Sequence, residues 1–553
     1  MQRFAELLDR LVLTPSRNGK LKLIADYFRA VPDPERGWAL AALTGELDIR
    51  SVKPAMLRDL MLDRMDEVLF GYSYDYVGDL AETIALVWPA PHDGTGPLRN
   101  DVPSLSEVIG TLEGATRIEG PKLVAEWLDR LDSSGRYALL KLVTGQLRVG
   151  ASSRLAKQAL ADFGGKDITE IEEMWHGLDA PYLALFDWLE GRADKPVSAA
   201  RSPFRPVMLS QPLEEPDYGR IDPDHYAAEW KWDGIRVQAT CEAGVRRLYS
   251  RTGDDISAAF PDLAEAMEFE GSIDGELLVA RPGGGGEPLL DPHGSVLRDD
   301  IVVGTFSDLQ QRLNRKSVSL AVQRKHPVFL RVYDLLQDGA DDLRALPFRE
   351  RRERLDRFMT KLEPTRFDVS PFIPFQTFDD LARARSHPPH AVIEGLMLKR
   401  WDSAYVPGRP KGPWFKWKQD PHVIDAVLMY AQRGHGKRSS FYSDYTFGVW
   451  TGPEGAGELV PVGKAYFGFT DAELKQLDKY VRDHTTERFG PVRSVRATRD
   501  EGLVLEIAFE GLQRSPRHKS GVAMRFPRVS RLRWDKPAAE ADRLETLQRM
   551  LPA

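Results

Sequence analysis

Apolar residues recur every three or four positions through the first 200 residues, and this spacing predicts amphipathic helices. The first such stripe covers residues 1–10. A second helix is expected to have Ser51 as its cap and Pro54 in its first turn. The apolar residues of the next three stripes are Leu57, Leu60, Met61, Met65 and Val68; Val124, Trp127, Leu128 and Leu131; and Leu139, Leu140, Val143 and Leu147. Residues 1–200 are therefore predicted to form an all-α domain.

The pattern changes after a linker rich in Pro, Ser and Arg at residues 195–212. Residues 205–420 alternate β-rich runs with helical stretches, which predicts an α+β domain. Residues 421–553 hold one helical stretch at 471–483 and several short apolar runs. These runs are typical of strands and cover residues 426–432, 445–450, 459–468 and 502–509. Several strands with one helix predict a β-rich barrel of the OB type.

Positive charge is concentrated in two stretches of a chain that is acidic overall. The 553 residues hold 76 Lys and Arg against 83 Asp and Glu, a net charge of -7. A nucleic-acid-binding protein with this balance must gather its cations locally. Residues 399–418 hold six Lys or Arg and one acid, and residues 515–536 hold seven and one. Aromatic residues alternate with these charges, which favours phosphate contact over a solvated face.

Other features exclude some classes of protein. Cys241 is the only cysteine, so disulfides and cysteine-based zinc sites are excluded, and its strand spacing from Val237 and Ala239 predicts a small core residue. The Gly-rich stretch 283–286 lacks the Lys-Ser/Thr of a phosphate-binding loop, so a flexible surface insertion is the better interpretation. No apolar stretch is long enough to span a membrane, and the N-terminus is not a secretory signal. We expect a soluble, cytoplasmic protein.

The strongest chemical signal is the run at residues 229–236, Glu-Trp-Lys-Trp-Asp-Gly-Ile-Arg. Lys231 can attack the α-phosphate of a nucleoside triphosphate and hold the nucleotide as a covalent adduct, provided that its amine loses its proton. Gly234 lets backbone approach closely because it has no Cβ. Arg236 offers a planar fork of donors for ribose or phosphate oxygens. The alternative interpretation is a strand and turn with a surface lysine.

Five further segments follow this run in a fixed order: residues 272–278, 328–336, 394–399, 414–418 and 525–536. In order and spacing they resemble the successive motifs of the ATP-dependent DNA ligases, from about residue 205 to the end. Residues 139–150 look like the helical DNA-binding domain of the three-domain ligases. Trp534 departs from the family pattern, since an acid is common there, and this puts the local salt-bridge pattern in doubt.

The resemblance implies three domains and a three-step reaction. The domains would be a helical DNA-binding domain at 1–200, a nucleotidyltransferase (adenylation) domain at 205–420 and an OB-fold domain at 421–553. Lys231 would react with ATP to give lysyl-AMP, AMP would pass to the 5′-phosphate of nicked double-stranded DNA, and the 3′-OH would displace AMP. We expect a monomer that encircles the DNA.

The resemblance also implies an ATP- and AMP-binding site around Lys231. Glu229 would accept a hydrogen bond from the adenine amino group, and as a residue two positions earlier in a strand it shares a face with Lys231. Tyr333 would stack on adenine and Met397 would cover its other face, with core packing as the alternative for both. The remaining ATP and phosphate candidates are Arg236, Arg251, Glu276, Lys399, Arg409, Lys416 and Lys418.

Three smaller groups of residues complete the prediction. Glu276 and Glu394 are the expected ligands of Mg²⁺ (or Mn²⁺), and Glu276 could hold the ribose, the metal or both. Arg525, Arg528 and Lys536 would orient the leaving pyrophosphate in a closed form and then swing away. The basic turn into a helix, formed by Arg148, Gly150, Ser152 and Arg154, suits a DNA phosphate, although an ordinary turn is the alternative.

Other classes of protein fit the sequence less well. RNA ligases and capping enzymes share the lysine motif, but the long helical N-terminal part and the complete terminal basic motif favour DNA. NAD-dependent ligases need an N-terminal nicotinamide module and usually a cysteine zinc site, against which the single cysteine argues. A non-catalytic DNA-end-binding protein would have lost catalytic residues, whereas every expected position is filled.

Overall fold

The computed structural model describes residues 1–551 apart from 78, 90–101, 146, 198–200, 283–300, 314, 316, 391, 434–441, 453–456, 467–469, 491 and 516–517. The Gly-rich stretch at 283–286 therefore lies outside the described residues. The chain divides into two compact units. One comprises residues 1–163, 180–186 and 420–553, and the other comprises residues 164–179 and 187–419.

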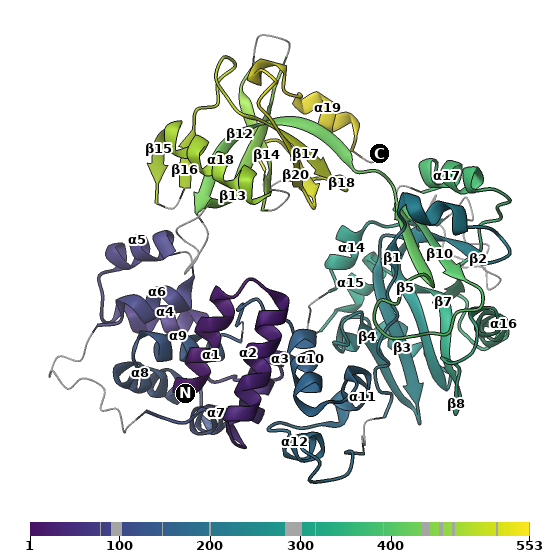
Figure 1. The fold of residues 1–553 in the computed structure, drawn as a ribbon, viewed down its shortest axis with the longest axis horizontal. Coiled ribbons are helices and arrows are strands. Elements are labelled where there is room, and N and C mark those ends of the chain that lie inside the picture. The colour runs from purple at the N-terminus through teal and green to yellow at the C-terminus, as the bar shows by residue number, and fades with distance from the viewer. Residues whose placement is uncertain are drawn as a thin grey trace. The chain divides into compact units, whose positions relative to one another are not determined.

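The N-terminal part of the described chain is built from helices (Figure 1). The predicted first helix is confirmed as α1 (Gln2–Leu13), which buries one face through Phe4, Leu7, Leu8 and Leu11. The others are α2 (Arg17–Ala30), α3 (Glu35–Thr44), α4 (Pro54–Leu62), α5 (Glu67–Val77), α6 (Leu80–Val87), α7 (Leu105–Gly114), α8 (Glu119–Arg130), α9 (Ser133–Val143), α10 (Ser153–Gly164), α11 (Ile168–Met174), η1 (Trp175–Gly177) and α12 (Leu183–Leu189).

The second predicted stripe is only partly right. Pro54 does open α4, but the cap residue is Lys53, whose side chain makes no capping bond. Ser51 is buried, and its hydroxyl donates to the carbonyl of Leu112 at 2.8 Å, so it supports α7 instead of capping α4. Since α4 ends at Leu62, the downstream residues of the stripe belong to the next turn and to α5.

The middle part contains two sheets among its described residues. The first has the order β1-β11-β10-β2. Its strands are β1 (Gln211–Pro212), β2 (Tyr226–Trp232), β10 (Ile393–Arg400) and β11 (Trp414–Lys418). The second has the order β4-β3-β5-β7-β8, with β6 on β5 and β9 on β7. Its strands are β3 (Ile235–Glu242), β4 (Val245–Ser250), β5 (Gly271–Pro282), β6 (Ile301–Val303), β7 (Val328–Asp338), β8 (Asp341–Asp342) and β9 (Phe367–Val369).

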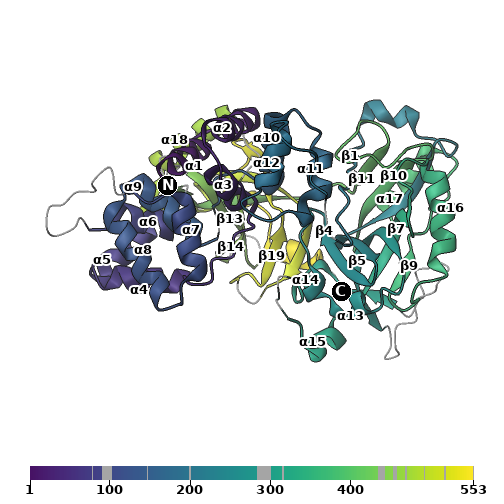
Figure 2. The same cartoon turned by 90° about the horizontal axis from the view of Figure 1, so that it is seen from below.

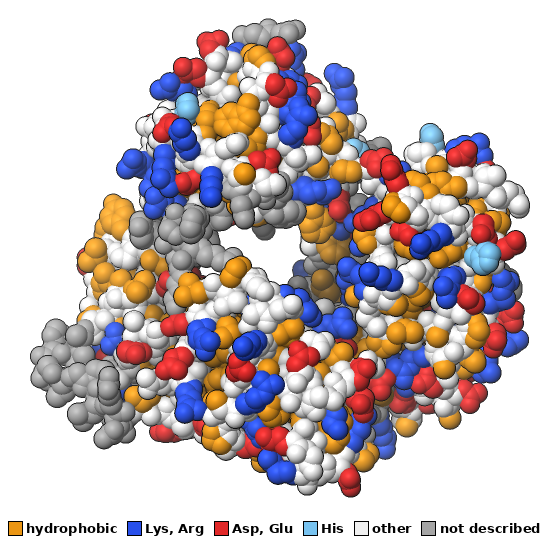
Figure 3. Space-filling view, viewed as in Figure 1, with side chains coloured by type: hydrophobic (Ala, Val, Ile, Leu, Met, Phe, Trp, Pro, Cys, Tyr) orange, Lys and Arg blue, Asp and Glu red, His pale blue; other side chains and the backbone are white. Residues whose placement is uncertain are grey.

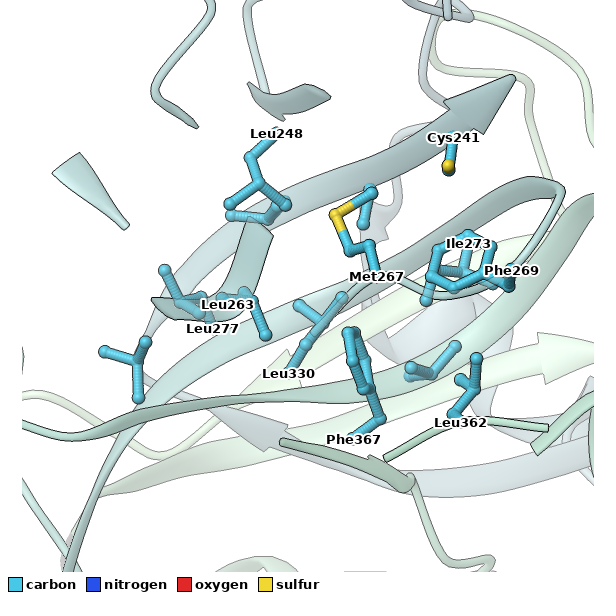
Figure 4. Packing of buried hydrophobic residues seen from close by; sticks show 14 of the residues in the cluster. Cys241, Leu248, Leu263, Met267, Phe269, Ile273, Leu277, Leu330, Leu362 and Phe367 are labelled. Atoms are coloured by element: carbon cyan, nitrogen blue, oxygen red, sulfur yellow. The ribbon is translucent and has the colours of Figure 1, made fainter. Parts of the chain in front are cut away.

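Helices pack against these sheets and close the core. Figures 1 and 2 both show α16 (Phe348–Met359) beside β7. A core cluster joins the second sheet to α16 (Figure 4), and Cys241 is buried in it at 3% exposure, as predicted. The shorter helical elements are η2 (Glu215–Arg220), η3 (Ser257–Ala259), α13 (Pro261–Glu265), α14 (Phe306–Gln310), α15 (Leu320–Lys325) and α17 (Phe378–Ser386).

The C-terminal part is a strand-rich region that contains the long helix α18 (Asp471–Asp483), as the pattern predicts. The sheet order is β14-β13-β12-β16-β15, with β17 pairing both β12 and β20, and β18 pairing β19. The strands are β12 (His422–Arg433), β13 (Tyr442–Trp450), β14 (Leu459–Ala465), β15 (Thr485–Phe489), β16 (Val492–Val495), β17 (Val504–Phe509), β18 (Gly511–Arg514), β19 (Val522–Arg525) and β20 (Arg528–Arg533), followed by η5 (Ala538–Glu540) and α19 (Leu544–Arg549).

The coarse fold class is thus confirmed: a helical N-terminal region precedes sheet-rich middle and C-terminal regions. The three domain boundaries and the finer names of the domains stay predictions. In the part of the chain that the structure describes, no helix is both long and apolar enough to cross a membrane.

Candidate active site

Strand register brings the predicted site residues onto one face of the first sheet. In β2, β10 and β11 the paired rows are Lys231, Gly395 and Lys418, then Glu229, Met397 and Lys416. Residues paired across neighbouring strands project from the same face, and Lys399 lies two positions beyond Met397 on β10. Gly395 permits this close pairing, because a Cβ there would lie 2.2 Å from the carbonyl oxygen of Trp417. Three motifs far apart in sequence therefore form one surface.

Glu394 bridges two lysines of this surface. The register between β2 and β10 shifts between Ile393 and Gly395, so Glu394 is the extra residue of a bulge, a feature that re-aims side chains. Its Oε2 lies 2.9 Å from Nζ of Lys231 and 3.2 Å from Nζ of Lys418. Burial acts to raise the pKa of Glu394, but the charges and hydrogen bonds of the two lysines outweigh it and hold the pKa below its usual value.

The pKa of Glu276 is shifted in the opposite direction, above its usual value. It lies on β5, and its Oε1 accepts a hydrogen bond from the backbone N–H of Gly234 at 3.1 Å. Burial raises the pKa of Glu276 to about 7, against the opposing charges of Lys231 and Arg236. The negative charge of Glu394 raises the pKa of Glu276 further, so the ionisation of the two carboxyl groups is linked. Near neutral pH the site therefore combines one ionised carboxylate with one that is poised between its two forms.

Cations gather beside these carboxyl groups. Burial lowers the pKa of Lys416, and the charges of Lys418, Arg409, Lys231 and Arg251 lower it further. Burial also lowers the pKa of Arg251, and the charges of Arg236 and Arg409 lower it further. Strand register places Lys231, Lys416 and Lys418 on one face of the sheet, and concentrated positive charge of this kind suits the oxygens of a phosphate chain.

Glu229 is held by two buried cations. It is 2% exposed, with Oε2 2.5 Å from Nζ of Lys399 and Oε1 3.1 Å from Nη1 of Arg352. Burial lowers the pKa of Lys399, against the attraction of Glu229. The Lys399 ammonium also lies 4.2 Å from the ring centroid of Tyr333 and 4.7 Å from that of Trp414. Glu229, Lys399 and Tyr333 are thus contiguous.

Asp274 is the centre of a second buried network. It accepts hydrogen bonds from Arg236 (Nη2 at 2.6 Å and Nε at 3.1 Å), from the hydroxyl of Tyr405 at 2.6 Å and from that of Tyr333 at 3.2 Å. Arg236 also donates to the carbonyl of Met208 at 2.7 Å. The guanidinium predicted to reach ribose or phosphate is therefore engaged with protein groups, which gives it a part in fixing the orientation of Tyr333.

The C-terminal candidates lie around β19 and β20. Nζ of Lys536 is 2.7 Å from Oδ2 of Asp425, an oxygen that Arg533 also approaches at 3.3 Å. Nη1 of Arg528 lies 3.9 Å from Oε1 of Glu510. Burial lowers the pKa of Arg525. Trp534, the departure from the family pattern, is 53% exposed.

The predicted basic turn borders a pocket of about 650 Å³. Ser152 accepts the N–H of Leu155 at 3.2 Å, so it caps α10. Arg154 is exposed and does not line the pocket. On the face shown in Figure 3, Lys and Arg are interspersed with Asp and Glu, so basic sites such as this one are local. The lining residues are Pro15, Arg17, Lys20, Arg148, Gly150, Ala151, Ser152 and Leu155.

Four residues of these sites were not predicted: Asp274, Tyr405, Arg352 and, at the lining of the basic pocket, Arg17. Asp274 lies inside the recognised segment 272–278, and its strand spacing from Glu276 could have indicated it. Tyr405 lies outside the recognised segments, four residues before the predicted Arg409. Arg17 follows Ser16, which caps α2 and accepts the N–H of Gly19 at 3.3 Å, a pattern readable from sequence. Arg352 has no such signal.

Fold and site together define an enzyme of nucleotide chemistry, and the comparisons with known proteins agree. The model of the ATP dependent DNA ligase domain matches residues 207–418, and that of the ATP dependent DNA ligase C terminal region matches residues 438–536. The chain belongs to the family of ATP-dependent DNA ligases.

Relatives match over nearly the full length of the chain. A probable DNA ligase of Koribacter versatilis is 31% identical, over 99% of this chain and 95% of its own. DNA ligase 1 of Korarchaeum cryptofilum is 28% identical, over 99% and 97%. The solved structure named Pmar-Lig_Pre shares the fold with a TM-score of 0.56 at 14% identity, covering 96% of this chain and 99% of its own.

Proposed function

We propose that this enzyme seals nicks in duplex DNA through a lysyl-AMP intermediate on Lys231 and a 5′-adenylated DNA intermediate. Nick sealing is the known role of the family. The observation that carries the assignment of Lys231 is its position on the sheet face that also holds Glu394, Lys416 and Lys418. Each step is a displacement at phosphorus, so positioning and charge neutralisation supply most of the catalysis.

In the first step the amine of Lys231 attacks the α-phosphate of ATP. The new N–P bond forms as the bond to pyrophosphate breaks, and the lysine proton leaves. Glu394 lies 2.9 Å from Nζ, within reach of that proton. Arg251, Arg409, Lys416 and Lys418 supply positive charge for the phosphate oxygens.

The nucleoside is assigned to the adjacent side chains. Glu229 accepts from the adenine amino group, the ring of Tyr333 stacks on the base, and Met397 covers the other face. Arg236 acts mainly by orienting Tyr333 through Asp274. Glu276 contacts the ribose in its neutral form or a cation in its ionised form, a choice that follows from its raised pKa.

Glu276 and Glu394 would hold a divalent cation. Among the described residues no cluster of three or more His, Cys, Asp or Glu forms a complete metal cage. Two carboxylates nevertheless suit Mg²⁺, which commonly takes one or two of them together with substrate phosphates and waters. The ion would neutralise phosphate charge and, by competing with Lys231 for Glu394, favour the neutral amine.

DNA contact is assigned to the helical and C-terminal parts. A basic pocket in the helical part would receive a backbone phosphate. It is lined by the predicted Arg148, Gly150 and Ser152 and also by Arg17. Arg525, Arg528 and Lys536 act on the leaving pyrophosphate. We further propose a monomer that encircles DNA in the cytoplasm and serves the processes that leave nicks: replication, repair and recombination.

A panel of nicked duplexes tests the substrate. Strands of DNA or RNA on each side of the nick should be offered to the full-length enzyme with ATP and Mg²⁺. We expect sealing of the all-DNA nick with ATP and none with NAD. Preferred sealing of an RNA nick would instead favour an RNA ligase.

A further inference from the structure

We infer that Arg352 is a positioning residue that makes the enzyme select adenine, because it holds Glu229 in a form that only accepts hydrogen bonds. The inference rests on the proposed function, in which Glu229 receives the adenine amino group. Arg352 lies on α16, outside every recognised motif. Its effect would be exerted through Glu229, with no contact to the nucleotide itself.

The guanidinium of Arg352 is fixed from several sides. It is 6% exposed. Nη1 lies 3.1 Å from Oε1 of Glu229, Nη2 donates to the carbonyl of Ser370 at 2.7 Å, and Nε donates to Asp356 at 3.1 Å. Its Cζ lies 4.1 Å from the ring centroid of Phe372, a residue bridged to Glu229 through the backbone. The group is therefore built to meet one oxygen of Glu229.

The neighbouring residue anchors the helix in this position. Arg351 forms a buried ion pair with Asp334, with both side chains 0% exposed and Nε 2.8 Å from Oδ1. It also donates to the carbonyls of Leu346 and Ser403. Because Arg351 fixes α16 against β7, Arg352 reaches Glu229 without freedom to withdraw.

Both oxygens of Glu229 thus meet a cation, Lys399 on Oε2 and Arg352 on Oε1. An ionised carboxylate has about four acceptor positions and no donor, so positions remain for a donor from the base. Adenine presents an amino donor at C6, whereas inosine and guanine present a carbonyl acceptor there. The paired carboxylate attracts the first and repels the second.

Loss of Arg352 should weaken this selection. Oε1 of a buried carboxyl would lose its cation and only Lys399 on Oε2 would remain, so the balance would shift from the ionised carboxylate toward the neutral acid. A neutral carboxylic acid has an O–H donor, which can serve a carbonyl at C6. A base with that carbonyl would then be accepted while adenine lost part of its partner.

The test compares ATP with inosine triphosphate, whose base has a carbonyl at C6 and a hydrogen on N1 where adenine has an amino group and an unprotonated nitrogen. Full-length wild type, Arg352→Gln and Arg352→Lys should be given each α-labelled nucleotide, and kcat/KM for covalent labelling measured. The wild type should strongly prefer ATP. We expect Arg352→Gln to lower the ATP-to-inosine ratio by about tenfold or more, since discrimination comes from matched hydrogen bonds. Arg352→Lys, which keeps a cation, should recover part of the ratio.

Two further variants guard against a purely structural effect. Arg349→Gln changes an exposed arginine of the same helix, which lies over Trp401 at 4.5 Å, and should leave the ratio unchanged. Glu229→Gln, which keeps Arg352, replaces the acceptor-only group with one that also donates, and should lower the ratio even if Arg352→Gln fails to fold.

Equal losses for both nucleotides in Arg352→Gln, with an unchanged ratio, would overturn the inference and leave the ligase assignment intact. An unchanged ratio in Glu229→Gln would do the same. Absence of labelling of the wild type by either nucleotide would overturn the proposed function as well.

Discussion

Replacing Gly234 by Ala should disturb the active site through backbone displacement alone. Gly234 lies in the turn between β2 and β3, three residues after Lys231, and its N–H binds Glu276. A Cβ would lie 2.4 Å from the carbonyl oxygen of Leu277 and 2.9 Å from Cγ of Glu276, where ordinary contact begins at 3.4 Å. The carbonyl belongs to the backbone of β5 and cannot turn aside, so the turn itself must move.

The required movement is about 1 Å, and a misplacement of that size can cost about 10²-fold in rate. We therefore expect lysyl-AMP formation by Gly234→Ala to be about 100-fold slower than by wild type in a single-turnover assay with α-labelled ATP. Gly219→Ala is the matched control, because a Cβ at this glycine of the same unit meets nothing within 4 Å. Its rate should stay within about twofold of wild type. A folded Gly234→Ala enzyme as fast as the control would show that the turn accepts a Cβ without displacing Lys231 or Glu276.

Three further outcomes are expected. Burial raises the pKa of Glu276 to about 7, and only its carboxylate form binds a cation. The apparent Mg²⁺ affinity for lysyl-AMP formation should therefore fall about tenfold from pH 8 to pH 6, more steeply than in Glu276→Gln. Parallel pH profiles for the two enzymes would contradict this. Arg17→Ala and Arg148→Ala should each weaken binding of nicked DNA and lower the salt slope by about 1, as judged by titration at several salt concentrations, with lysyl-AMP formation unchanged. Arg528→Ala and Lys536→Ala should slow lysyl-AMP formation by about 10²-fold while sealing of a pre-adenylated nick is much less affected, since no pyrophosphate leaves in that step; the reverse pattern in the two half-reactions would make them plain DNA contacts.

Sequence periodicity predicted the local elements well where one face is buried. The first helix and α18 follow directly from their spacing. Ser51 was wrongly expected to cap α4, because its preference for helix starts cannot reveal that the carbonyl of Leu112 takes its hydroxyl. A partner 61 residues away lies beyond any local pattern.

Some residues of the candidate site could be predicted from the sequence and others could not. Strand alternation alone relates Glu229 to Lys231, whereas the order of motifs, through the family resemblance, indicated Met397, Lys416 and Lys418. Register then explains why these residues share a face. Arg352 was missed because it meets Glu229 across 123 residues of sequence and resembles the other arginines of its helix. Contacts set by tertiary packing leave no periodic mark in the sequence.

Lys231 is proposed to carry the nucleotide, and mapping of the covalent adduct tests this directly. The full-length protein should be incubated with Mg²⁺ and α-labelled ATP and then analysed by denaturing electrophoresis and peptide mapping. We expect an acid-labile AMP adduct on Lys231, abolished in Lys231→Ala and retained in Lys411→Ala, which changes an exposed lysine of the same basic stretch. Labelling of Lys231→Ala at the wild-type level, or an adduct mapped to another residue, would contradict it.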